Sequence, residues 1–258
     1  MSLTAGLPGR TARSVRSPFS RLVATAVAAG LLAGLALTAV QRVQVTPLIA
    51  QAETYEEAQG AAAAPLAAQA HEHAHEEQQA QHQQQQEQHQ HAGWKPENGV
   101  ERTLFTVLAN ATMGVGYGLL LCAAMLMRGA RPSWRQGLLW SAAGYVVFFV
   151  APSLGLPPEL PGTLAAPVSA RQAWWICTAF STAVAIGALA WSRNVWFKVG
   201  AVALLLVPHL VGAPQPPVHS MAAPAELVGS FIIATALANA VFWLALGGLT
   251  GYFYKKFA

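Results

Sequence analysis

Histidine is concentrated in one stretch of this sequence, residues 71–94, which reads HEHAHEEQQAQHQQQQEQHQHAGW. The stretch holds six of the eight histidines of the chain and four of its glutamates. Neutral imidazole nitrogens and carboxylate oxygens are ligands for divalent transition metals, so the pattern predicts metal capture. The candidate ligands in this His/Glu tract are His71, His73, His75, His82, His89, His91, Glu72 and Glu76.

The spacing of these ligands suits a chain that wraps around a cation. His71, His73 and His75 share one face of an extended chain, and His71 and His75 share one face of a helix. Without an imposed geometry such a tract cannot select a metal, because copper then outbinds nickel, cobalt and zinc. The alternative is a solvated Gln-rich linker whose histidines are incidental.

Three further candidate ligands lie near the ends of apolar segments. Glu159 lies in LPPELPG, His209 in PHLVGAP and Glu226 in PAEL. Proline frees backbone carbonyls there, and non-helical backbone at membrane depth often marks ion sites in transporters. His209 is the histidine within an apolar segment, which makes it a functional hypothesis. The alternatives are an interfacial histidine bonded to a carbonyl, and a Glu226 that complements a helix dipole.

The composition shows which elements must position these ligands. The chain is 54% hydrophobic and 10% charged, against about a quarter charged in soluble domains. Several apolar runs approach the roughly 20 residues that cross a bilayer as a helix. The sequence therefore predicts an all-α, polytopic helical membrane protein. The expected transmembrane helices cover residues 22–41, 103–127, 137–156, 172–191, 197–212 and 227–253.

Four parts follow from these helices. Residues 1–21 form a basic tail, 22–41 the first transmembrane helix, 42–102 a mostly disordered outer loop rich in His, Gln and Glu, and 103–258 the helical membrane domain. The length of the first run favours a retained helix over a signal peptide, with Ala50–Gln51–Ala52 as the alternative cleavage site.

The charges support six helices with both termini in the cytoplasm. That topology puts 11 of the 15 basic residues inside and all 11 glutamates in or beside outer segments, as the positive-inside rule requires. Five helices would place Lys255 and Lys256 outside.

Several small and polar residues predict how the helices pack. Gly30 and Gly34 form a small-xxx-small pair that would let another helix approach, although such a pair also arises by chance. The glycines of residues 114–118 indicate a close-packed helix face and not an ion filter. Asn110 and Asn239 are expected to form interhelical hydrogen bonds.

Other classes of function are excluded by what the sequence lacks. The basic residues are spread along the chain and form no patch for nucleic acid. The chain has no phosphate loop, no aspartate and no nucleophile with a plausible histidine partner, so we do not expect an enzyme.

The order of motifs resembles the family of predicted cobalt transporter subunits, CbtA, from about Arg21 onwards. The matching blocks are LLAGLALTAVQ, AETYE, HEHAHE, GWKPENGVERTLFTVLAN, LGLPPELPG, ARQAWW, PHLVGAP, PAEL and NAVFWLALGGLTGYFY. The resemblance implies cobalt uptake across the inner membrane for cobalamin supply, with five helices instead of six. It also implies a partner, a small single-span His-rich subunit similar to CbtB.

These observations lead to one main interpretation and two alternatives. In the first, the tract collects Co²⁺ outside and the ion passes inward near Glu159, His209 and Glu226, as cargo and not as a tightly bound cofactor. In the second, the chain is a membrane-anchored metal-binding accessory that conducts nothing itself. In the third, it transports nickel or copper.

Overall fold

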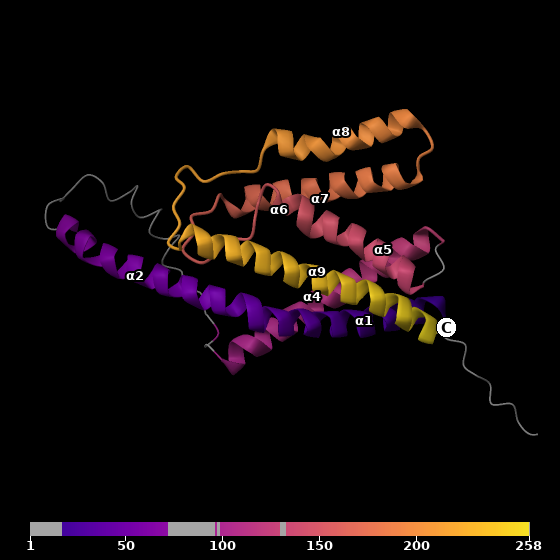
Figure 1. The fold of residues 1–258 in the computed structure, drawn as a ribbon, viewed down its shortest axis with the longest axis horizontal. Coiled ribbons are helices and arrows are strands. Elements are labelled where there is room, and N and C mark those ends of the chain that lie inside the picture. Colours follow the sequence, from indigo (N-terminus) through magenta and orange to yellow (C-terminus); the bar gives the residue numbers. More distant parts are fainter. Residues whose placement is uncertain (1–16, 72–95, 97–98, 130–132, 258) are drawn as a thin grey trace, which may run out of the picture.

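The structure, a computed structural model, describes residues 17–71, 96, 99–129 and 133–257. In these ranges the regular elements are helices (Figure 1). In chain order they are α1 (Pro18–Val40), the π-helical turn η1 (Gln41–Val45), α2 (Thr46–His71), α4 (Val100–Met127), α5 (Trp134–Tyr145), the π-helical turn η2 (Val146–Val150), α6 (Ala151–Ser153), α7 (Val168–Trp191), α8 (Val195–Val211) and α9 (Ala225–Lys256).

The predicted all-α, polytopic membrane architecture is confirmed. Four helices in the described ranges are long and apolar enough to cross a membrane: Pro18–Ala61, Val100–Met127, Val168–Trp191 and Ala225–Lys256. The two other predicted spans are also helical, as α8 and as the continuous run α5–η2–α6. With 17 residues, α8 is about 26 Å long, slightly less than the roughly 30 Å hydrocarbon core. Six crossings therefore stay a prediction.

Residues 42–71 correct the prediction of a mostly disordered outer loop. The first helix does not end at residue 41 but continues through η1 into α2 as far as His71. Alanine, glutamine and glutamate are good helix formers. The segment needs no core of its own, because Val45 and Ala52 are buried in the core of the bundle and Leu48 packs against it. Most of the predicted loop that remains, residues 72–95 and 97–98, lies outside the described residues.

Both π-helical turns precede a proline within a helix. η1 ends two residues before Pro47, and η2 ends two residues before Pro152. Proline lacks an N–H group and its ring clashes with the carbonyl of the preceding turn. In η1, Thr46 N donates to Gln41 O, and in η2, Ala151 N donates to Val146 O; each bond spans five residues instead of four. An inserted π turn is one of the established ways in which a helix absorbs such a disruption.

Glycines set the closest helix crossing, between α1 and α4. A Cβ atom added to Gly30 would lie 2.5 Å from the carbonyl carbon of Gly114, and one added to Gly34 would lie 2.5 Å from the carbonyl oxygen of Asn110. On α4, a Cβ atom at Gly118 would meet the backbone of Ala26. The small-xxx-small interface is therefore confirmed, and within residues 114–118 the close-packed face is formed by Gly114 and Gly118 but not by Gly116.

Most of the described basic residues lie at one end of the bundle, whereas Arg102 and Arg171 pair with glutamates at the other end. At one end Arg21 lies over the ring of Tyr254, with 5.9 Å to the centroid, and Arg128 lies 5.2 Å from the centroid of Trp191. We call this the basic end. The cations near the helix ends found there include Arg21, Arg128, Arg135, Arg193, Lys198, Lys255 and Lys256.

The opposite end of the bundle, from which α2 extends, is called the acidic end (Figure 1). Its carboxylates include Glu53, Glu56, Glu159 and Glu226.

Candidate metal-handling site at the acidic end

Two proline-rich loops form the surface of the acidic end. Residues 154–167 connect α6 to α7, and residues 212–224 connect α8 to α9. Thr163 and Met221 form an isolated β-bridge between them. Leu164 N donates to Ser220 O at 3.0 Å, and Ala222 N donates to Gly162 O at 3.3 Å. Hydrogen bonding between the two backbones joins the loops into one surface.

The first turns of α2 lie on this surface. Ala52 belongs to the same buried cluster as Leu160 and Ala223, one residue from each loop. Gly162 has φ +76°, a conformation that favours glycine. A Cβ atom there would lie 2.7 Å from the Cβ of Ala222 and 3.3 Å from the Cβ of Glu56. The helix that leads to His71 is therefore seated on the loops that adjoin the other candidate ligands.

The predicted ligand Glu159 is already engaged. Arg171, in the first turn of α7, donates from its guanidinium to the Glu159 carboxylate at 2.7 Å. Both side chains are about 30% exposed, and a pair so close to solvent is worth at most about 1 kcal/mol. This ion pair ties the first proline-rich loop to α7. A cation that bound Glu159 would have to share or displace the arginine.

His209 lies one residue beyond Pro208 within α8. The helix is not broken at the proline but ends at Val211, where Gly212 follows with φ +85°. Pro208 O, one of the last carbonyls of the helix, accepts a hydrogen bond from Trp174 Nε1 at 3.2 Å. The Trp174 ring also meets the half-buried His209 ring edge to face at 6.0 Å between centroids.

These contacts fix His209 against α7 at the acidic end. They also show a role for Trp174 that the sequence did not reveal, since its indole N–H donates to Pro208 O, which also accepts from Gly212 N.

Glu226 is exposed in the first turn of α9, after the cap residue Pro224. A carboxylate there complements the positive end of the helix dipole. No three His, Cys, Asp or Glu side chains gather into a metal site within the described ranges. Glu159, His209 and Glu226 are thus brought to one end of the bundle without forming a three-ligand cluster, and each stays a prediction as a ligand.

Seven predicted ligands of the tract lie outside the described residues: His73, His75, His82, His89, His91, Glu72 and Glu76. The eighth, His71, is the last residue of α2.

An ion pair that the sequence did not suggest joins the two helices on either side of the tract. Arg102 of α4 donates to both carboxylate oxygens of Glu53 in α2, at 2.8 and 3.3 Å. A two-bonded arginine–carboxylate pair fixes orientation as well as distance. A prediction that residues 46–61 continue the first helix would have been needed to find this pair, because a glutamate in a flexible loop has no defined partner.

The predicted interhelical hydrogen bonding of Asn110 is confirmed. Its buried amide donates to Thr38 Oγ1 at 3.0 Å and to Gln41 Oε1 at 2.6 Å, next to the π-helical turn η1. The amide of Asn239 donates to Thr235 O within the same helix, α9. The hydrogen bond found for Asn239 is therefore within one helix and not between two helices, as the sequence had predicted.

The family model of the probable cobalt transporter subunit CbtA matches residues 19–255. The chain belongs to the CbtA family. The match spans every described helix from α1 to α9 and the His/Glu tract, so the resemblance seen in the motifs is confirmed. No curated protein and no solved structure matches the chain.

Family membership fixes the coarse identity of the chain. It is a multi-pass membrane protein of a family of probable cobalt transporter subunits, which is not an enzyme family. A subunit implies at least one partner.

Proposed function

We propose that this CbtA-family chain captures Co²⁺ outside the cell with its His/Glu tract and delivers the ion to the acidic end for uptake. One observation carries the proposal: Ala52 of α2 shares a buried cluster with Leu160 and Ala223 of the two proline-rich loops, and Glu56 of α2 lies beside Gly162. The helix that ends at His71 and the loops beside Glu159, His209 and Glu226 therefore belong to the same end of the molecule.

The Glu53–Arg102 ion pair supports delivery at this end. The tract connects the end of α2 to the start of α4, and Arg102 lies in the first turn of α4. The pair holds that turn beside α2, 49 residues away in sequence. A metal ion bound by the tract is therefore tethered to the acidic end by helices on both sides.

The concentration of basic residues at the basic end supports an acidic end that faces outward. Cations at the basic end would then lie in the cytoplasm with both termini, as the positive-inside rule favours. In that orientation the tract and the proline-rich loops meet metal as it arrives. Passage inward would use the His209 imidazole and carbonyls at the end of α8, because one strong ligand with weak oxygens can both bind and release a cation.

The Glu159–Arg171 ion pair favours a second candidate function. If Glu159 stays paired with Arg171, it does not bind the metal ion. The chain would then be a metal-binding accessory, and a partner would conduct the ion. The partner that we propose is the small single-span His-rich subunit similar to CbtB. Nickel or copper is the alternative cargo, because a His-rich tract does not discriminate by geometry.

Metal uptake by the purified chain in liposomes separates these functions. A cobalt-sensitive dye inside the vesicles should respond to external Co²⁺ if the chain conducts by itself. Cobalt binding without dye response would support the accessory function. If Co²⁺ neither bound nor entered while nickel or copper did, cobalt would be the wrong cargo. If none of the three metals bound, metal capture would be refuted.

A further inference from the structure

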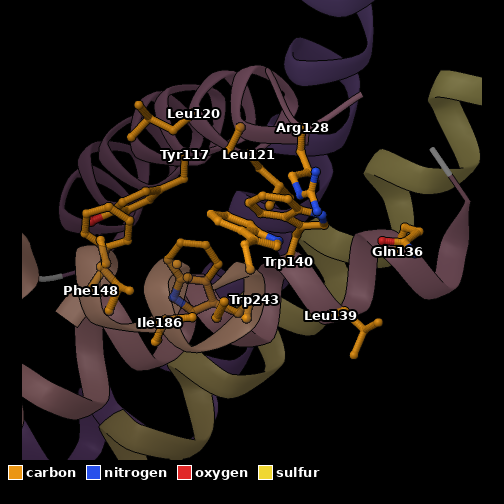
Figure 2. A pocket seen from close by; sticks show the side chains of 18 residues that line it. Tyr117, Leu120, Leu121, Arg128, Gln136, Leu139, Trp140, Phe148, Ile186 and Trp243 are labelled. Atoms are coloured by element: carbon orange, nitrogen blue, oxygen red, sulfur yellow. The ribbon is translucent and has the colours of Figure 1, made fainter. Parts of the chain in front are cut away.

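An apolar groove lies at the basic end of the bundle, away from the candidate metal site. Its volume is about 780 Å³, and side chains from α4, α5, η2, α7 and α9 line it. Figure 2 shows Tyr117 and Phe148 at one end of the groove, with Arg128 and Gln136 towards the other. The volume lies in the range of about 300–1,000 Å³ that is usual for small-molecule sites.

Packed aromatic rings preform the floor of the groove. The ring of Trp243 stacks on Phe148 at 5.9 Å between centroids and lies 4.9 Å from Tyr117. Gly144 leaves room for the indole, since a Cβ atom there would lie 2.7 Å from Trp243 Cη2. These contacts hold the hollow open, so a ligand need not reorganise the helices.

The groove is amphipathic along its length. Arg128 is the one charged residue among the described residues that line it, and Gln136 lies at the same end. Arg128 also lies over the ring of Trp191, whose indole is 5.7 Å from that of Trp140. Tryptophans beside a cation are typical of the level of lipid headgroups. The arrangement is complementary to a molecule with an anionic head and an apolar tail.

The length of the groove distinguishes between two candidate occupants, a lipid and a transmembrane helix of a partner. From Gln136 to Phe148 the path along α5 and η2 is about 18 Å, and from Tyr117 to Arg128 along α4 it is about 17 Å. One leaflet of the hydrocarbon core is about 15 Å thick, whereas a spanning helix needs about 30 Å of contact. The groove therefore matches one acyl chain in one leaflet.

We infer that this groove is a binding site for an anionic phospholipid from the leaflet at the basic end. The phosphate binds at Arg128 and Gln136, and an acyl chain follows the aromatic floor towards Phe148. Basic pockets between transmembrane helices bind anionic headgroups in this way. The site is independent of the proposed metal path.

Lipid titration of the full chain tests the inference. The delipidated protein in mild detergent is titrated with phosphatidylglycerol or with phosphatidylcholine, and bound lipid is counted by native mass spectrometry. The anionic lipid should bind more tightly. Arg128→Gln should weaken its binding about fivefold, the effect of removing one cation near a membrane surface. Arg193→Gln is the matched control, because Arg193 lies at the basic end but does not line the groove.

A second variant tests the tail. Ala183→Phe places a ring in the groove from α7 and should lower binding of both lipids, while melting in detergent reports whether the fold survives. Equal affinity for the two lipids would overturn the inference. So would equal losses in Arg128→Gln and Arg193→Gln, full binding in a folded Ala183→Phe variant, or a co-purified protein helix that excludes lipid.

Discussion

The crossing of α1 and α4 predicts a large difference between two glycine-to-alanine substitutions. In Gly30→Ala the new Cβ atom would lie 2.5 Å from the C and O atoms of Gly114 and from Val115 N. Ordinary contact between such atoms begins at about 3.5 Å, so the helices must separate by about 1 Å. Overpacking of this kind costs about 1–3 kcal/mol, and a gap of that size weakens the neighbouring contacts as well.

Gly116→Ala is the matched control, because it makes the same chemical change on α4 with nothing within 4 Å of the new atom. Both substitutions gain the helix propensity of alanine, about 1 kcal/mol, so this gain cancels in the comparison. The free energy of unfolding of Gly30→Ala should therefore be about 1–3 kcal/mol lower than that of Gly116→Ala.

The assay is reversible unfolding of the purified protein in mixed micelles, followed by circular dichroism, with thermal melting as a second measure. Equal stability of the two variants would refute the close crossing that places Asn110 against α1. Destabilisation by Gly116→Ala alone would show that α4 presents a different face.

The proposed function leads to three further predictions. Deletion of residues 71–91 should reduce uptake mainly at low Co²⁺, because the tract raises the local metal concentration; loss of uptake at saturating metal, with normal membrane insertion, would instead make the tract part of the pathway. His209→Ala should lower maximal uptake at equal membrane abundance, and His219→Ala should do so less, because His219 is exposed in the second loop with Gln215 as its contact at 3.3 Å. A wild-type rate of Co²⁺ uptake in His209→Ala would refute a role of His209 in transport and leave it a structural contact of Trp174. A reporter fused after Ala258 should be active in the cytoplasm, and a cysteine introduced at Gln85 should react with an impermeant reagent from outside; periplasmic activity of the reporter would contradict the proposed orientation.

The positions of several membrane helices could be predicted closely from the sequence. The predicted segment 103–127 is α4 (Val100–Met127), and the predicted segment 227–253 lies within α9 (Ala225–Lys256). Such predictions succeed because the bilayer imposes a local rule, in which an apolar run of sufficient length must satisfy its backbone hydrogen bonds within itself.

For the candidate site, the sequence predicted individual residues but not the contacts between them. The sequence named Glu159 and His209, but not the Arg171 guanidinium that binds the first or the Trp174 indole that lies against the second. These partners depend on how the loops and α7 pack. Packing is a property of the whole bundle and leaves little trace in local composition.

Composition and charge by themselves determined that this protein is a polytopic helical membrane protein with a His/Glu tract, because lipid solvation and charge placement act on each segment separately. Tertiary structure decided the course of residues 42–71. Their composition is compatible with either a polar loop or a helix, and contacts of Val45 and Ala52 within the core favour the helix. It also decided that Glu53 meets Arg102, since two side chains 49 residues apart become neighbours only after the helices that carry them have packed.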